Sequence, residues 1–524
     1  MLPPASYQPA DEFDGEIFDR LVPADHYLRQ VLAVVDFERC RQELVSCYSP
    51  DQGRPAIEPT LLLKLEFLQY HYNLSDREVV EQSRYNLAFR YFLGLSLNSS
   101  LPHHTDLAVF RRRLGVEIHQ RVFDALVGQA RERGLVKDRL RLKDATHMIA
   151  NIAIPSAIAL VAETRQRLLA AAQPYAPERV REEEARALVI HSTTEDLGGA
   201  ERLLQRVTHL RSILTWVDPL VATGPPIPSD ASQWQALLEA VAVAHKVVKD
   251  REQPDPKDRL VSVHDTDARW GDHHGLYAGY KLDVAQDADS GIITAVNVIP
   301  ANGDEARDGT ALIEREEQAH GNDVQALSID GIGFVGPLLR EWTDPKRLNL
   351  EVIVPPPKPQ PLTGHFTPDH FTLNEAGDEL TCPTGQTTRQ RKRNREDTGW
   401  LFRFGRSACA ACPLQKQCLE KLPQHKGRTV TSNDYAAEYK AARAKVETPA
   451  YQEARRQHWR IERTLGEMTR WHEARHARYR GQRKSLIQGL LTAVVVNAKR
   501  VVRSLADLGR AGAGTVRAEL AGTG

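Results

Sequence analysis

The sequence lacks an excess of charge of either sign. Its 524 residues include 69 Lys and Arg residues and 69 Asp and Glu residues, so the formal net charge is +0. This balance leaves only local asymmetries to indicate a charged partner. The length is several times that of a usual domain, and we expect two to four domains with real hydrophobic cores.

A long apolar segment and a secretory pattern are also missing. The longest apolar run, residues 486–496, is shorter than the stretch of about 20 residues that a membrane-spanning helix needs. The first twenty residues are rich in Pro, Asp and Glu, without a basic stretch followed by an apolar core. We therefore expect a cytoplasmic protein with no membrane segment.

Cysteine is scarce and unevenly placed. Of the six cysteines, Cys40 and Cys47 lie far from the other four. Clustered thiols in a cytoplasmic chain favour metal binding over disulfides, and four thiolates could close a tetrahedral Zn²⁺ site. The alternative is a set of reduced cysteines in a poorly ordered insertion. The cluster consists of Cys382, Cys409, Cys412 and Cys418.

One region is strongly basic although the whole chain is neutral. Residues 451–503 contain thirteen Lys or Arg residues and four Asp or Glu residues, a local excess of nine positive charges. Such asymmetry favours contact with nucleic acid near the carboxyl end. The alternative is a solvated face of a helix.

The amino-terminal pattern predicts a series of helices over residues 56–134. Pro59 stands near the start of an amphipathic helix with leucines at helical spacing. Ser75 and Glu78 have the spacing of a capping box, and Thr105 is expected to cap a later helix.

That later helix carries three consecutive arginines. Short helices with a basic triplet are compatible with a DNA-binding unit of the helix-turn-helix kind and equally with an ordinary helical bundle. The three residues are Arg111, Arg112 and Arg113.

Strand patterns begin at residue 139. Residues 139–144 alternate and predict a short strand that ends at Asp144. After about a hundred mostly helical residues, a hairpin is predicted around the turn "DADSG". It is followed by a helix, a strand that ends at Asp330, a short helix and a further strand. A long helix then carries Glu462 at the border of its apolar stripe.

Without the helical block and the cysteine block, the order is strand, two-stranded hairpin, helix, strand, helix, strand, helix. This order fits an α/β fold with a ribonuclease-H-like mixed sheet and helices. It would follow an all-α amino-terminal domain and be interrupted by a helical insertion and a Cys-containing insertion. In such a sheet the first and fourth strands end side by side, and the last helix packs against them. Asp144, Asp330 and Glu462 occupy these three places.

Three carboxylates from separate elements match the needs of phosphodiester chemistry. Two divalent cations about 4 Å apart can activate an attacking oxygen and stabilise the leaving oxygen. Mg²⁺ (or Mn²⁺) takes hard oxygen ligands and leaves sites for water and phosphate.

Each acid also has a simpler interpretation. Asp144 could cap the segment after its strand, and Asp330 could be a turn residue. Glu462 could form surface ion pairs with Arg460 or Arg463, worth about 0–1 kcal/mol if exposed. Only the occurrence of all three acids in topological order favours catalysis.

Further polar residues precede the hairpin, in the segment "DTDARWGDHHG". Because they do not end a central strand, we interpret the segment as a structural or substrate-contacting loop rather than a metal site. The residues are Asp265, Asp267, His273 and His274.

Several segments resemble, in the right order, the DDE transposases of bacterial insertion sequences. They include "LPHHTDLAVFRRRLG", "KDATHMIAN", "DTDARWGDHHGLYAGYKLDVAQDADSG", "CPTGQ" with "CAACPLQKQC", and "IERTLGEMTRW" with "ARYRGQRKSLIQGLL". The similarity covers roughly residues 20–503.

The resemblance implies an amino-terminal region that binds the ends of the element and a ribonuclease-H-like domain that cuts and rejoins DNA. Carried over by position, the catalytic and metal-binding acids fall on Asp144, Asp330 and Glu462. Two features depart from the family's pattern. The segment "DGIGF" places glycine and the aromatic residue one position later than Asp-x-Gly-Tyr, and Thr469 stands where many relatives carry lysine.

We therefore predict a transposase that binds terminal inverted repeats and catalyses metal-dependent strand cleavage and strand transfer. Its partners would be double-stranded DNA of the element ends and the target, and a second copy in a homodimeric synaptic complex. The alternatives are an inactive transposase-derived DNA-binding protein and a nuclease without strand transfer. The predicted DNA contacts are Arg111, Arg112, Arg113, Arg460, Arg463, Arg470, Arg478, Arg480 and Lys484.

The predicted organisation has seven parts. The ranges are 1–135 for the helical DNA-binding domain, 136–154 for the first catalytic strand, 155–256 for the helical insertion, 257–356 for the catalytic core, 357–440 for the Cys-rich insertion, 441–508 for the catalytic carboxyl-terminal helices and 509–524 for a flexible tail.

Overall fold

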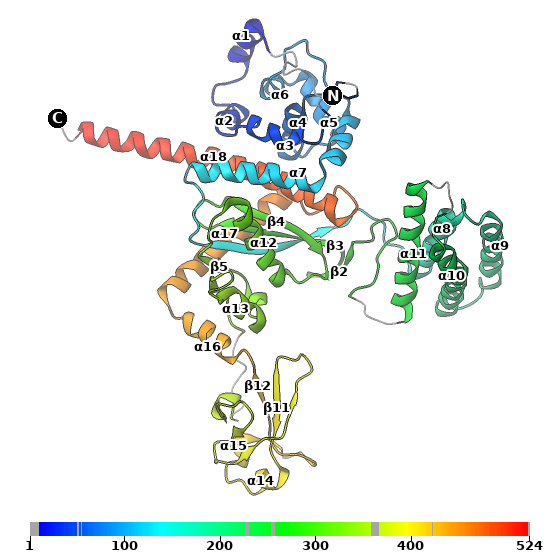
Figure 1. Cartoon of the computed structure of the whole chain (residues 1–524). Helices are drawn as coiled ribbons and strands as arrows, with labels where there is room; N and C mark the ends of the chain where they lie inside the picture. Colours follow the sequence, from blue (N-terminus) through cyan, green and yellow to red (C-terminus); the bar gives the residue numbers. More distant parts are fainter. Residues whose placement is uncertain are drawn as a thin grey trace.

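A mixed sheet lies at the centre of the computed structural model, with the amino-terminal helices and two insertions arranged around it (Figure 1). The structure describes residues 10–49, 52–53, 55–225, 230–252, 257–273, 275–357, 366–421 and 423–521, with side chains as far as residue 507. The predicted His274 and part of the proline-rich linker lie outside the described residues.

The amino-terminal region is all helical, as predicted. Its elements are α1 (Glu12–Leu21), α2 (Tyr27–Val34), η1 (Glu38–Cys40), α3 (Arg41–Val45), α4 (Pro59–His71), α5 (Asp76–Tyr85), α6 (Leu87–Leu93) and α7 (His104–Glu132).

The local start signals of these helices are mostly confirmed. Pro59 is the first residue of α4, and Ser75 and Glu78 form both bonds of the capping box of α5. The predicted cap at Thr105 is wrong, because His103 caps α7 and Asp106 completes its capping box. The helix α4 is not amphipathic, because it is buried nearly all round and forms the centre of the region.

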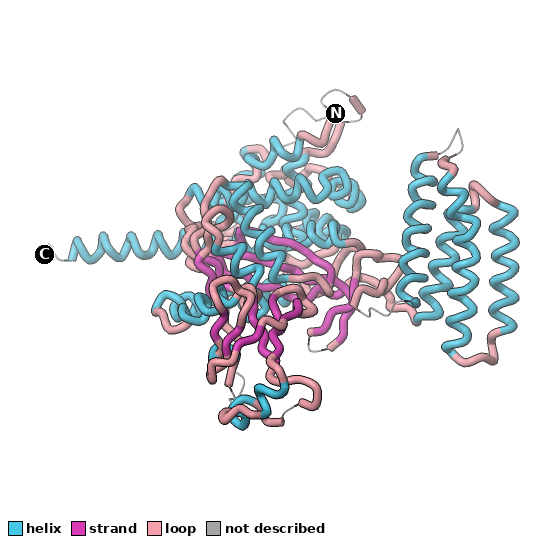
Figure 2. The backbone as a smooth tube through the Cα atoms, turned by 60° about the horizontal axis from the view of Figure 1, so that its bottom comes forward, coloured by secondary structure: helices cyan, strands magenta, loops and turns pink. Residues whose placement is uncertain are grey.

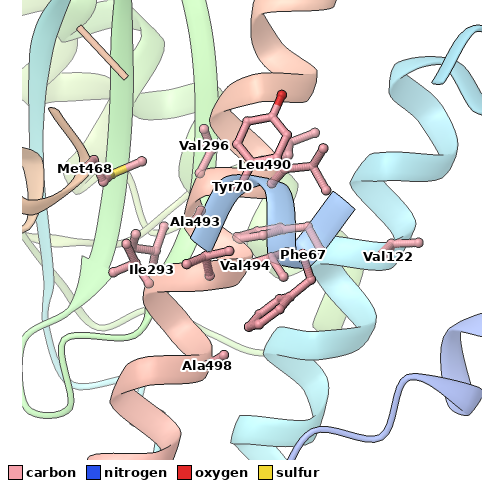
Figure 3. Packing of buried hydrophobic residues seen from close by; sticks show 14 of the residues in the cluster. Phe67, Tyr70, Val122, Ile293, Val296, Met468, Leu490, Ala493, Val494 and Ala498 are labelled. Atoms are coloured by element: carbon pink, nitrogen blue, oxygen red, sulfur yellow. The ribbon is translucent and has the colours of Figure 1, made fainter. Parts of the chain in front are cut away.

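The amino-terminal helices and the sheet share one hydrophobic core. Helix α18 (Gln482–Ala521) lies between them, and Figure 3 shows Leu490, Ala493 and Val494 of α18 among side chains from α4, α7 and the sheet. At Gly489 a Cβ atom would come 2.9 Å from Leu282 Cδ1, so glycine permits the close approach of α18 to the sheet. The boundary predicted at residue 135 therefore does not separate two cores.

The sheet has six strands. Strand β3 pairs with β1 on one side and with β4 and β2 on the other, and β1 continues in parallel to β5 and β6. The strands are β1 (Arg141–Ile149), β2 (Arg269–Asp272), β3 (Leu276–Asp287), β4 (Ile293–Pro300), β5 (Ala326–Ser328) and β6 (Glu351–Ile353). The predicted strand end at Asp144 is wrong, because antiparallel pairing with β3 continues to Ile149.

Helices cover both faces of the sheet. On one face, α12 lies over β3 and β4 and contacts β1 through the ion pair of Glu316 with Arg141. On the other face, α17 and α18 pack against the same sheet. The helices around the sheet are α12 (Glu305–His320), η2 (Gly331–Gly333), α13 (Gly336–Thr343), α16 (Ala436–Lys445) and α17 (Pro449–Trp471).

The helical insertion has a core of its own. Its four helices lie side by side and apart from the sheet (Figure 2), and they enclose a separate apolar cluster that includes Leu168, Leu210 and Ala244. The helices are α8 (Ala157–Ala172), α9 (Pro177–Thr193), α10 (Gly199–Ala222) and α11 (Ala231–Glu252).

The Cys-rich insertion is built from short elements around a small core that includes Phe402 and Phe404. It contains two three-stranded sheets, one with the strand order β7-β8-β9 and one with the strand order β10-β11-β12. The elements are η3 (Pro368–His370), β7 (Thr372–Leu373), β8 (Leu380–Thr381), β9 (Thr387–Thr388), β10 (Arg391–Arg393), β11 (Gly399–Arg403), α14 (Arg406–Ala410), α15 (Gln415–Cys418) and β12 (Thr429–Asn433).

The carboxyl-terminal helix differs from the prediction in its length. Helix α18 continues to Ala521, where a flexible tail was expected from residue 509. Its segment Gln482–Asp507 is long and apolar enough to cross a membrane, but 78% of the apolar window is buried inside the protein. The apolar character of α18 is therefore explained by its position in the core.

Candidate active site

The parallel pairing of β1 and β5 brings Asp144 and Asp330 to neighbouring positions. Leu142 of β1 is paired with Ser328 of β5, and each aspartate stands two residues beyond its member of that pair. Neighbouring strands lie about 4.8 Å apart, and residues two apart on extended backbone point to the same side. Asp330 retains an extended backbone conformation, so both side chains are expected on one face.

A hydrogen bond identifies that face as the one covered by α17. The Ser328 hydroxyl lies 3.1 Å from Nδ1 of His458, which belongs to α17. Ser328 therefore faces α17, and by strand alternation Asp330 and Asp144 face the same way.

Asp144 is half-buried and carries an unusual pKa. Burial raises the pKa of Asp144 to about 6, against the effect of the Ala145 amide, which donates to it at 2.8 Å. The negative charge of Asp330 adds to the rise. The two carboxylates are therefore close enough to repel each other, as adjacent ligands of one cation site would be before the cation binds.

Both aspartates also make local backbone bonds. Asp330 accepts a hydrogen bond from the Ile332 amide at 3.2 Å and begins η2, which agrees with its simpler interpretation as a turn residue. Asp144 does not cap a following segment, because its strand continues. Among the ion pairs of the described residues, none includes Asp144, Asp330 or Glu462.

Glu462 is exposed on α17 and is not assembled with the two aspartates into a metal site. In the part of the chain that the structure describes, no three His, Cys, Asp or Glu side chains are grouped to hold a metal ion. Glu462 nevertheless shares one edge of α17 with Arg455 and His458, at spacings of seven and four residues. His458 contacts Ser328, and Arg455 donates to the Ile329 carbonyl at 3.1 Å, so this edge is directed toward Asp330.

Arg455 and His458 were missed by the sequence prediction. Both lie on the edge of α17 that carries Glu462, and helical spacing from Glu462 was the signal that identifies them. Burial lowers the pKa of His458 to about 4, so its ring is neutral at neutral pH. Thr469, in the place of the family's lysine, donates to the Leu465 carbonyl of its own helix at 2.9 Å.

The predicted DNA contact at Arg111 is contradicted by its burial. Its guanidinium forms ion pairs with Glu66 and Asp76 inside the amino-terminal core. Arg111 therefore holds α7 to α4 and α5. Its neighbours Arg112 and Arg113 are exposed, and Arg113 lies over the ring of Tyr48 at 4.4 Å.

The basic residues of the carboxyl-terminal region divide into two groups. Arg478 donates to the Leu74 carbonyl at 2.8 Å and lies over Tyr70, so it joins the amino-terminal helices to the segment before α18. Arg480 donates to the Asn151 carbonyl at 3.1 Å. The second group is exposed and makes no such link to another part of the described structure; it consists of Arg463, Arg470 and Lys484. Arg460 is exposed as well but donates to the Ala288 carbonyl.

Two aspartates of the loop before the hairpin make contacts within the fold. Asp265 is buried and accepts a hydrogen bond from the Tyr280 hydroxyl, while Asp267 accepts from the Gln482 amide at the start of α18, at 3.0 Å. The ring of His273 is tilted against that of His147 of β1, with ring centroids 4.7 Å apart. These contacts support the structural interpretation of Asp265 and Asp267.

The four clustered cysteines line one small pocket of about 30 Å³ in the Cys-rich insertion. Burial raises the pKa of Cys418, and Arg428 opposes that rise, while the other three cysteines are close enough to add to it. The Thr384 hydroxyl lies 3.1 Å from Cys382 Sγ and 3.9 Å from Cys412 Sγ. The thiols thus converge, although they are not grouped at metal-binding geometry.

Two family models match the chain. Residues 16–113 match a model described as a transposase domain (DUF772), and residues 381–502 match one described as a transposase DDE domain. The second match includes Glu462 and the clustered cysteines, whereas Asp144 and Asp330 lie outside both matches. No curated protein and no solved structure gives a significant match.

The family matches confirm the resemblance that the sequence motifs indicated. The chain carries a match to a transposase domain near its amino-terminal end and a match to a transposase DDE domain near its carboxyl end, and together these matches support a DDE transposase of insertion sequences. DNA is therefore the partner that the family implies.

Proposed function

We propose that the protein binds the terminal inverted repeats of an insertion sequence and catalyses metal-dependent cleavage and transfer of DNA strands. The main support for this proposal is the carboxylate pair of Asp144 and Asp330, which lie at two adjacent parallel strands and on the same face of the sheet. Neither aspartate has an ion-pair partner among the described residues. The strand order, with β1 between antiparallel β3 and parallel β5, supports a ribonuclease-H-like catalytic domain.

The donor set fits a divalent cation such as Mg²⁺ or Mn²⁺. Carboxylate oxygens are hard ligands, and a cation here would remove the repulsion that contributes to the raised pKa of Asp144. Divalent cations at such a site supply an activated attacking oxygen and stabilise the leaving oxygen of a phosphodiester. Asp144 and Asp330 would hold them, and Glu462 would complete the set from the edge of α17.

The chain's own residues would position the DNA strand. Exposed arginines on α17 would contact phosphates, and His458, buried and neutral, would fix α17 on β5 through Ser328. Because the amino-terminal helices share a core with α18, DNA ends held by those helices would keep a fixed orientation to the carboxylates. A homodimer would bring two such ends together.

One observation favours a second candidate, a transposase-derived DNA-binding protein that does not cut. Within the described residues Glu462 is exposed and not grouped with the two aspartates. Such a protein would bind the ends of the element and leave them intact.

The test uses purified full-length protein, Mg²⁺, labelled end DNA and a target plasmid. The transposase should give both cut and joined products, a nuclease only cut ones, and an inactive protein only bound DNA. Asp144→Asn and Asp330→Asn should abolish both products while retaining binding to end DNA. Full activity of either variant would remove that residue from the site.

We also propose a structural Zn²⁺ in the Cys-rich insertion, held by the four cysteines that line its pocket. The insertion has a small apolar core, so a metal would add folding free energy to it. Metal analysis should find about one zinc per chain, and the Cys409→Ser with Cys412→Ser double variant should lack it. Protein without zinc, and with unfolding unaffected by a chelator, would refute this assignment.

A further inference from the structure

A groove on the outer side of α17 is not explained by the carboxylate pair. It has a volume of about 1050 Å³ and lies between α17, the adjoining part of α18 and the turn between β3 and β4. Three acidic side chains line it, namely Asp289, Glu462 and Glu467. Six basic side chains line it as well, so its formal net charge is +3; they are Arg460, Arg463, Arg470, Lys499, Arg500 and Arg503.

Half of these cations are held by the protein itself. Lys499 and Arg500 form ion pairs with Glu467, at 3.1 and 3.4 Å, and Arg460 donates to the Ala288 carbonyl at 2.6 Å. The other three are exposed and form no ion pair within the described part of the chain. These are Arg463, Arg470 and Arg503. They remain available for an anionic ligand.

Two exposed tryptophans line the same groove. Trp459 is 49% exposed and Trp471 is 69% exposed, whereas the other five tryptophans are buried or half-buried. The guanidinium of Arg463 lies 5.6 Å from the centre of the Trp459 ring. Twelve residues of helix place the two tryptophans about 18 Å apart along the axis of α17. A strand with the rise of duplex DNA, about 3.4 Å per nucleotide, would cover this distance with roughly five nucleotides, and a more extended unpaired strand would need fewer.

A basic groove with exposed aromatic rings is better suited to unpaired DNA than to an intact duplex. In an intact duplex the flat faces of the bases are stacked on each other, so an indole gains little from contact with them. An unpaired base offers a free face, and stacking on an aromatic side chain combines with phosphate contacts to bind single strands.

We propose that this groove binds unpaired nucleotides of the DNA substrate, with Trp459 and Trp471 stacking on bases and the free arginines contacting phosphates. The inference rests on the proposed function. Since Glu462 lines the same groove, the unpaired nucleotides would lie beside one of the three candidate catalytic residues. The substrate would then be an element end whose strands separate close to the point of cleavage.

The test compares the affinities of the full-length protein for a blunt duplex and for the same duplex with a tail of about five unpaired nucleotides. Wild type should bind the tailed DNA more tightly. Trp459→Ala and Trp471→Ala should each reduce this preference by about tenfold, because stacking of one base is lost. Trp459→Phe and Trp471→Phe are matched controls that retain an aromatic face, and they should keep most of the preference.

The outcomes separate this inference from the proposed function. Duplex binding that the tail does not strengthen, or alanine variants that keep the full preference, would overturn the inference alone. Absence of any DNA binding by wild type would overturn both. Alanine variants that change the oligomeric state, measured by light scattering, but keep the preference would show that the tryptophans contact a second protein chain instead.

Discussion

The two faces of the central sheet differ in whether the charged side chains of β1 have ion-pair partners. On the face covered by α12, the basic side chains of β1 are almost fully buried and paired. Arg141 contacts Glu316 at 2.6 Å, and Lys143 contacts Asp283 at 3.1 Å. On the α17 face, one residue further along β1, Asp144 has no ion-pair partner among the described residues.

This difference separates charges that the protein itself compensates from charges that it does not. A buried charge is tolerated when a partner of opposite sign compensates its loss of hydration. Arg141 on the α12 face meets that condition within the protein, because Glu316 compensates its charge. Asp144 on the α17 face does not, because the charge that affects it most strongly is the like charge of Asp330. A cation from solution would complete this face.

The largest predicted effect is on stability, at Glu316. Burial alone would raise the pKa of Glu316, but the positive charge and hydrogen bonds of Arg141 lower it, and the charge of Arg131 lowers it further. Glu316→Gln would leave the buried Arg141 without its main partner, which should cost about 3–5 kcal/mol of unfolding free energy. Urea unfolding would measure it.

The matched control is Glu314→Gln, on the same helix. Glu314 is half-exposed and pairs with Arg347 at 3.5 Å, so its replacement should change stability by less than about 1 kcal/mol. Equal losses of unfolding free energy in the two variants would contradict the distinction between buried and exposed ion pairs.

The next largest effect is a pH-dependent gain in stability when Asp144 is replaced by Asn. Burial raises its pKa from 3.8 to about 6, so the folded protein binds more protons than the unfolded chain between these values. Asp144 therefore costs stability as pH rises through this window. In metal-free protein, Asp144→Asn should match wild type near pH 4 and exceed it above pH 6, by about 1–3 kcal/mol.

Asp138 provides a control of opposite sign. Against the effect of burial, hydrogen bonds and charge from Arg131, with Arg141, lower the pKa of Asp138. Asp138→Asn should therefore lose stability relative to wild type above its lowered pKa. A loss of stability in Asp144→Asn above pH 6 would contradict the contrast between the faces.

The smallest effect on stability is expected at Glu462. It is exposed and unpaired among the described residues, so Glu462→Gln should change the unfolding free energy by less than about 0.5 kcal/mol. Its effect on DNA cleavage should nevertheless be a complete loss. Glu453→Gln, at an exposed position of the same helix, is the control for both measurements. Normal cleavage by Glu462→Gln would restrict the site to the two aspartates.

Much of this contrast was accessible from the sequence because it follows from local spacing and element order. Strand alternation separates Lys143 from Asp144, and the succession of elements places Asp330 beside Asp144. The capping box at Ser75 is similarly local, since both of its bonds connect residues three apart.

The failures concern contacts between segments distant in the sequence. In the sequence, Arg111 belongs to a basic triplet that was interpreted as a DNA contact, but its acidic partners are residues of α4 and α5. The length of β1 depends on pairing with β3, more than a hundred residues away, so the local pattern ended it at Asp144 too early. The position of Glu462 relative to the aspartates depends on how α17 crosses the sheet, which spacing along one helix does not determine.

The central claim is that the α17 face of the sheet binds a divalent cation through Asp144 and Asp330. Its most direct test is calorimetric titration of Mn²⁺ into the full-length wild-type protein, Asp144→Asn and Asp330→Asn. We predict that wild type binds the cation and that each variant binds it at least about tenfold more weakly. Equal Mn²⁺ affinity in all three proteins would contradict the account.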